Sequence, residues 1–139
     1  MSYSETTNKR LCVIGESDPF LARLLQRFAE KNGLRVQSAR TGDEVLDMVQ
    51  QYRPALIILE PELPGKVRGW EAARVLKTTV QTDNVPLIIC AWLKKDDAYA
   101  LGGQASAYLQ KPDLHYEDFV AALIAAGITT LPSESDDPV

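Results

Sequence analysis

The chain has 139 residues, of which 45% are hydrophobic and 24% are charged, and its formal net charge is −4. This length fits one globular domain with a core of its own and is short for two. The acidic balance argues against a nucleic-acid-binding surface, and no apolar run is long enough to cross a membrane. The first ten residues are polar and contain no apolar signal segment, so we expect a cytoplasmic protein.

Apolar runs of β type alternate with segments of helical periodicity along the chain. The predicted strands cover residues 11–15, 34–39, 55–59, 86–91 and 107–110. The predicted helices follow them over residues 18–33, 41–53, 70–80, 95–103 and 114–126. Helical periodicity places Phe20 on the buried face of the first helix and Ile124 on that of the last.

Residues typical of helix ends support these boundaries. Asp18 is a good N-cap, and the following proline suits the first helical position. Gly33 is typical of a helix end, and Thr41-Gly-Asp-Glu44 has the pattern of a capping box at the start of the second helix. Pro54 cannot continue that helix, so the third strand begins directly after it.

Five strands separated by helices predict a doubly wound, flavodoxin-like α/β fold, with a parallel sheet in the order 2-1-3-4-5 and helices on both faces. We expect a disordered segment at 1–8, one domain at 9–127 and a flexible acidic tail at 128–139. Two strand spacings, roughly 9.6 Å, separate strands one and four in this order. Because a disulfide needs Cα atoms within about 7 Å, Cys12 and Cys90 should be free thiols.

The polar residues of interest follow the strands. Open α/β sheets bind ligands at the carboxyl ends of their strands, where strand order reverses. Glu16, Ser17 and Asp18 follow strand one, Glu60 follows strand three, and Lys111 follows strand five. Such carboxylates could hold Mg²⁺, which prefers oxygen ligands. On residue chemistry alone, it is equally consistent that Asp18 only caps a helix and that the glutamates are solvated loop acids.

Four motifs give the chain a resemblance to response-regulator receiver domains over roughly residues 9–127. They are Glu16-Ser-Asp-Pro19, Leu59-Glu-Pro-Glu-Leu-Pro-Gly65, the proline before strand four, and Tyr108-Leu-Gln-Lys-Pro112. The resemblance implies the CheY-like fold. It also implies an activity in which a partner histidine kinase transfers a phosphoryl group to an aspartate beside Mg²⁺, which an acidic pair holds.

The chain departs from the pattern that this resemblance implies. The phosphoacceptor position carries Glu60, the second position of the acidic pair carries Ser17, and the phosphoryl-contacting hydroxyl is replaced by Ala91. The first acid, Glu16, and the lysine, Lys111, remain. An extra methylene moves the acceptor carboxylate by roughly 1.5 Å, and phosphoryl transfer depends on positioning and charge stabilisation. The site is therefore interpreted as degenerate.

The leading hypothesis is a pseudo-receiver, a non-enzymatic protein-interaction module in signal transduction that needs no phosphorylation. We expect no cofactor, with Mg²⁺ at most weakly bound by Glu16 and Glu60. Pairing of Glu60 with Lys111 could partly imitate a modified site or be a plain structural ion pair. One alternative is a receiver that still accepts a phosphoryl group at or near Glu60. Another is a flavin or nucleotide binder, which the glycine-poor loop after strand one disfavours.

The expected interaction surface comprises helix four, strand five and helix five, the output and dimer face that the resemblance implies. Trp92, Tyr99 and Tyr108 lie on or near it, and aromatic residues dominate interface hot spots. The expected partner is a signalling protein or histidine kinase, with a homodimer through the same face possible and no nucleic acid or membrane partner. Trp70 is expected in the core and His115 on the surface at a helix start.

Overall fold

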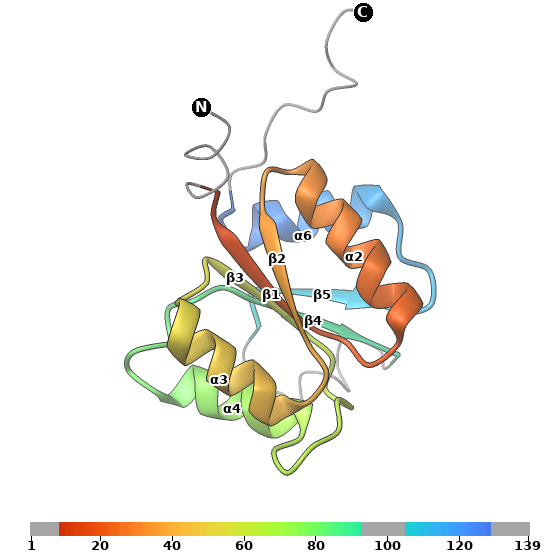
Figure 1. Cartoon of the computed structure of the whole chain (residues 1–139). Helices are drawn as coiled ribbons and strands as arrows, with labels where there is room; N and C mark the ends of the chain where they lie inside the picture. The colour runs from red at the N-terminus through yellow and green to blue at the C-terminus, as the bar shows by residue number, and fades with distance from the viewer. Residues whose placement is uncertain (1–8, 93–104, 129–139) are drawn as a thin grey trace, which may run out of the picture.

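The computed structural model describes residues 9–92 and 105–128 of the chain. Its sheet has five parallel strands in the order β2-β1-β3-β4-β5, which confirms the predicted topology (Figure 1). The strands are β1 Leu11–Gly15, β2 Arg35–Ala39, β3 Leu56–Leu59, β4 Leu87–Ala91 and β5 Ala107–Gln110. Strands β1, β3 and β4 are buried along their whole length, as expected for central strands covered on both faces.

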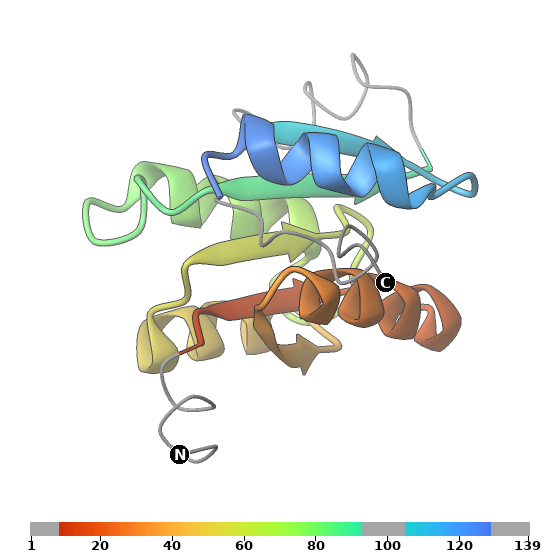
Figure 2. The same cartoon turned by 90° about the horizontal axis from the view of Figure 1, so that it is seen from above.

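Helices cover both faces of this sheet. They are α2 Pro19–Lys31, α3 Gly42–Tyr52, α4 Gly69–Thr78 and α6 Tyr116–Ala125. Helices α2 and α6 lie on one face and α3 and α4 on the other, as Figures 1 and 2 show from two directions. The helix predicted over 95–103 lies outside the described residues. No helix in the described ranges is long and apolar enough to cross a membrane.

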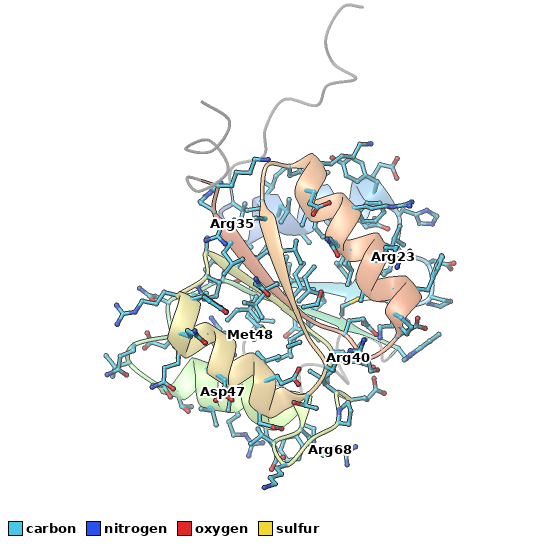
Figure 3. All side chains as sticks on the ribbon, in the orientation of Figure 1. Arg23, Arg35, Arg40, Asp47, Met48 and Arg68 are labelled. Atoms are coloured by element: carbon cyan, nitrogen blue, oxygen red, sulfur yellow. The ribbon has the colours of Figure 1, made fainter. Side chains whose placement is uncertain are left out.

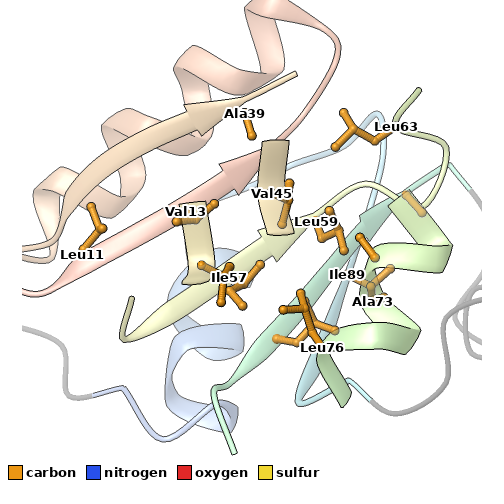
Figure 4. Packing of buried hydrophobic residues seen from close by; sticks show 14 residues of the cluster. Leu11, Val13, Ala39, Val45, Ile57, Leu59, Leu63, Ala73, Leu76 and Ile89 are labelled. Carbon is orange, nitrogen blue, oxygen red and sulfur yellow. The ribbon is translucent and has the colours of Figure 1, made fainter. Parts of the chain in front are cut away.

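Two apolar clusters, one on each face of the sheet, form the core. The cluster under α3 and α4 joins Val13, Ile57 and Ile89 of the strands to helix residues such as Val45 and Leu76 (Figure 4). The other cluster contains Cys12 and Cys90, which are free buried thiols as predicted. Burial raises the pKa of the Cys90 thiol to about 12, so it packs as a small hydrophobic residue.

Helix ends follow local sequence rules, with one exception. Asp18 Oδ1 accepts hydrogen bonds from the backbone N–H groups of Phe20 (2.8 Å) and Leu21 (3.3 Å), and Thr41 caps α3 through Glu44 N–H. The exception is the end of α3, where Arg53 adopts a left-handed conformation with φ 50°. That conformation favours glycine, and Arg53 is the only non-glycine residue with positive φ in the described ranges.

Several predicted burial assignments are wrong. Phe20 is 73% exposed because Leu21, Leu25 and Ala29 form the buried face of α2. Ile124 is 63% exposed because Phe119, Ala122 and Leu123 form the buried face of α6. Trp70 is half-buried, with the Arg74 guanidinium 5.2 Å from its ring centroid. Ile128, which the predicted boundary assigns to the tail, is buried in the core.

Charged side chains lie mainly on the outside of the helices and on the β2 edge. Arg23 on α2, Arg35 and Arg40 at either end of β2, and Asp47 on α3 are all exposed (Figure 3). Met48 of α3 is partly buried and packs against the core cluster on its face. The few charged groups that are buried lie at the carboxyl edge of the sheet.

Candidate functional site

Three charged side chains meet at the carboxyl edge of the sheet. Glu16 follows β1, Glu60 follows β3 and Lys111 follows β5, and their residues are only 4%, 5% and 2% exposed. Backbone hydrogen bonds fix two of these positions, because Glu60 N donates to Gly15 O (2.9 Å) and Lys111 N donates to Ala91 O (2.8 Å). The alternative that the two glutamates are solvated loop acids is therefore wrong.

Lys111 pairs with both carboxylates. Its Nζ lies 2.8 Å from Glu16 Oε1, donates to Glu16 Oε2 at 2.9 Å, and lies 3.3 Å from Glu60 Oε2. The contact to Glu16 Oε1 is electrostatic, since that oxygen receives no hydrogen bond within the described structure. The pairing of Glu60 with Lys111 that the sequence suggested is present, and Glu16 shares the same ammonium group.

Ser17 holds the second oxygen of Glu60. Its backbone N–H and its hydroxyl donate to Glu60 Oε1 at 2.9 and 2.7 Å. Asp18 N donates to Glu16 Oε2 at 3.0 Å, whereas the Asp18 carboxylate faces the helix start that it caps. Ser17 occupies a position where the family resemblance implies an acid, and in the structure this residue is a hydrogen-bond donor. A hydroxyl residue between two acids in the loop is the signal that could have indicated this.

Electrostatics separates the two glutamates. Burial raises the pKa of Glu16 above its ordinary value, and it outweighs the hydrogen bonds from Lys111 and Asp18 N–H. Burial also acts to raise the pKa of Glu60, but the two Ser17 hydrogen bonds and the Lys111 charge outweigh it, so that pKa is lowered. For Lys111, the two carboxylates outweigh burial and raise its pKa. The pairing with Lys111 thus favours the charged form of Glu60 more than that of Glu16.

Two further residues complete the surroundings. Ala91, at the end of β4, is 1% exposed and supplies no hydroxyl to the site. The next residue, Trp92, is 52% exposed, and the Lys111 ammonium lies 5.9 Å from its ring centroid. The ring thus extends over the ion-pair cluster, defined here as Glu16, Glu60 and Lys111, while part of it stays in solvent.

The residues present do not suit a divalent cation. Of the oxygens that could bind Mg²⁺, both of Glu16 face Lys111, and both of Glu60 are engaged by Ser17 and Lys111. The Lys111 ammonium at this position repels a second cation and offsets one of the two negative charges that would hold it. Within the described ranges, no group of three or more His, Cys, Asp or Glu residues is placed to hold a metal ion.

The other predicted site residues are dispersed. Tyr108 on β5 is half-buried, and it packs against the core cluster under α3 and α4. His115 is the exposed N-cap residue of α6, as expected for a surface residue at a helix start. Tyr99 lies outside the described residues, as do the predicted segment 1–8 and residues 129–139 of the predicted tail.

Glycine packing fixes the backbone around Glu60. A Cβ atom on Gly69 would collide with the Glu60 carbonyl oxygen, and Gly69 N donates to Leu63 O at 2.9 Å. The loop between β3 and α4 thus folds back against the residue that occupies the centre of the site. A glycine at the first position of the following helix is the sequence signal for such a close approach.

Residues 12–123 match the family described as the response regulator receiver domain. The polar-differentiation response regulator DivK of Brucella anthropi is 30% identical over 102 residues, which cover 72% of this chain and 82% of that protein. The transcriptional regulatory protein AfsQ1 of Streptomyces coelicolor is 30% identical over 99 residues, 70% of this chain but only 42% of that protein.

The same fold is found among solved structures. A sensor protein from Polaromonas sp. JS666 superimposes with a TM-score of 0.75 at 22% identity. The match covers 84% of this chain and 94% of that one. At 22% sequence identity, this similarity is evidence for the fold alone.

Proposed function

The chain belongs to the response-regulator receiver family, and we propose that within it this protein is a pseudo-receiver, a protein-interaction module that works without phosphorylation. The observation that carries the proposal is the ion-pair cluster. Both oxygens of Glu60 are already engaged, one by Ser17 and the other by Lys111. A carboxylate held in this way is a poor nucleophile, because whichever oxygen attacked phosphorus would have to give up the donors that engage it.

The environment also lacks groups that would stabilise an incoming phosphoryl group. Such a group adds up to two negative charges and several acceptor oxygens. Ala91 has no hydroxyl to donate, and the Lys111 ammonium is shared between two carboxylates. Because this one ammonium already serves two carboxylates, it offsets little of their repulsion of a phosphoryl group, and the transition state gains little electrostatic stabilisation.

Glu60 resembles a modified site in one respect. It brings one negative charge against Lys111, where phosphorylation would bring a larger charge to the same ammonium. We infer that this pair holds the domain in one state, so that partner binding is constitutive. The proposed partner is a signalling protein or a histidine kinase, which contacts Trp92 and the surface near Tyr108, or a second copy of this chain through the same face.

The test is intact-mass measurement after incubation with acetyl phosphate and Mg²⁺. In that reaction a carboxylate oxygen attacks phosphorus and acetate leaves, adding roughly 80 Da as one phosphoryl group. We expect no adduct on the natural chain. The matched control carries Ser17→Asp, Glu60→Asp and Ala91→Thr together and should gain an adduct. An adduct on the natural chain that maps to Glu60 would instead establish the alternative, a receiver with residual phosphoacceptor activity.

A binding experiment tests the interaction surface. Light scattering of the natural chain beside Trp92→Ala and Tyr108→Ala reports self-association, and the same variants serve once a partner is identified. We expect Trp92→Ala to weaken association, because a half-exposed aromatic side chain is a typical interface anchor. Unchanged association in both folded variants would place the interface elsewhere.

A further inference from the structure

A groove with a volume of about 670 Å³ lies between the C-terminal ends of α3 and α4. Because all strands are parallel and these residues precede β3 and β4, the groove is at the edge of the sheet opposite the ion-pair cluster. Its volume lies within the roughly 300–1,000 Å³ range of small-molecule sites. Its apolar lining comprises Leu46, Val49, Pro54, Val75, Leu76 and Val85.

The polar lining of the groove contains donors and no carboxylate. Thr79 and Thr82 also line it, but their hydroxyls already donate to the carbonyls of Val75 (2.6 Å) and Leu76 (2.7 Å). Three longer polar side chains remain, Gln50, Arg53 and Gln81, and all three residues are exposed. One cation and two amides beside an apolar surface complement an anion with an apolar body.

Arg53 is the residue in this set that needs an explanation. Its side chain forms no hydrogen bond or ion pair with any residue in the described ranges. The neighbouring cations of α4 are engaged, since Lys77 Nζ donates to Val85 O at 2.8 Å and Arg74 lies over the Trp70 ring. Arg53 also holds a left-handed conformation that glycine would adopt without strain. Strained residues of this kind occur at ligand clamps.

We propose that this groove binds a monocarboxylate with an aliphatic body. The aliphatic chain lies against Val49, Leu76 and Val85, and the carboxylate pairs with Arg53. Guanidinium groups bind carboxylates through two parallel hydrogen bonds, which suits a single unpaired arginine beside an apolar surface. The site is separate from the ion-pair cluster and does not depend on the proposed function.

Octanoate is the probe, and chemical shifts in ¹H–¹⁵N NMR spectra are the readout. We expect saturable shifts at Val49, Gln50, Thr79 and Thr82, with no comparable shifts at Glu16 or Glu60. Acetate has the carboxylate without the long aliphatic chain, and octylammonium has the same aliphatic chain with a positive charge. Both should bind more weakly than octanoate.

Variants assign the binding to Arg53. Arg53→Gly should weaken octanoate binding about two- to fivefold, the range of a solvent-exposed ion pair. This variant should fold at least as well as the natural chain, because glycine suits the left-handed position. Arg53→Lys keeps the charge and should retain more affinity. Arg27→Gln, which removes an exposed arginine on α2, is the matched control and should change nothing.

Two results would overturn the proposal. One is the absence of saturable shifts in the groove at millimolar octanoate. The other is an octanoate affinity that does not change in Arg53→Gly, or an octylammonium affinity equal to that for octanoate. Either outcome shows that Arg53 does not select a carboxylate.

Discussion

Charged residues have opposite environments at the two edges of the sheet. At the carboxyl edge, Lys111 and two glutamates are buried and form ion pairs with one another. At the other edge, Arg53 is exposed beside an apolar groove and has no partner in the described structure. The buried charges of the carboxyl edge thus pair with one another, whereas the charge of Arg53 at the opposite edge is left to solvent.

The difference follows from the strand order. Glu16, Glu60 and Lys111 extend from the ends of β1, β3 and β5, so the topology forces them together and they must pair or remain costly buried charges. Arg53 follows a helix end at the surface, where water can solvate it. Pairing at the first edge is a requirement of folding, whereas an unpaired charge at the second is tolerated and remains available for a ligand.

Removing the ammonium group should have the largest effect. Lys111→Met leaves Glu16 and Glu60 buried without a cation, and breaking a buried ion pair in this way costs about 3–5 kcal/mol. Urea unfolding measures this change. The control combines Lys111→Met with Glu16→Gln and Glu60→Gln, which removes the charges together and should recover much of the loss. If Lys111→Met is as stable as the natural chain, the Lys111 ammonium is not needed to balance the buried glutamates.

The two glutamates should differ in their contributions. Glu60→Gln keeps one oxygen that can accept the two Ser17 hydrogen bonds, but it removes the negative charge and places an amide donor against the Lys111 ammonium, at an expected cost of about 1–3 kcal/mol at pH 7. Glu16→Gln should cost less, because burial already disfavours its charged form and Glu60 remains as a partner for Lys111. A larger loss of stability for Glu16→Gln than for Glu60→Gln in the same unfolding assay would contradict this prediction.

The pH dependence of stability sharpens the same comparison. The pKa of Glu60 is lower in the folded protein than its ordinary value of 4.5, so the stability that it contributes is present above 4.5. That stability is lost as the pH falls through the lower folded value. Glu60→Gln should therefore flatten the acid limb of a plot of unfolding free energy against pH. An unchanged acid limb would show that other carboxylates cause the loss of stability at low pH.

Much of this molecule was predictable from its sequence, for physical reasons. Unbroken apolar runs and helix caps at Asp18 and Thr41 determined the order of elements, and the strand order then placed Glu16, Glu60 and Lys111 at one edge. What the sequence did not reveal depends on side-chain direction. Ser17 could be interpreted only as a lost acid until its hydroxyl was seen to donate to Glu60.

The opposite edge was missed for a similar reason. Arg53 precedes a proline at a helix end, which marks the boundary without revealing a left-handed backbone or an unpaired side chain. The groove itself comes from helices α3 and α4, which are joined through β3 and a long loop, so no local pattern indicates it. Burial on α6 was also misjudged, because alanine at 122 faces the core while Ile124 does not.

The smallest expected effect is at Arg53. Arg53→Gly should raise stability by about 0.5–1 kcal/mol, since glycine holds φ 50° without strain. Gly127→Ala is the converse control, because a Cβ there would meet no atom but φ is +79°. It should lower stability by a similar amount. Thermal unfolding measures both, and a loss of stability in Arg53→Gly would indicate that the arginine side chain stabilises the fold.

The most direct test of the closed site uses beryllofluoride, a phosphoryl analogue, with Mg²⁺. A receiver site that can hold a phosphoryl group should show saturable NMR shifts at Ser17, Glu60 and Lys111 as the analogue binds. Because Lys111 and Ser17 already engage both oxygens of Glu60, we predict that these signals do not move in the natural chain. Saturable shifts at Glu60 and Lys111 would contradict the claim that the ion-pair cluster has replaced the phosphorylation site.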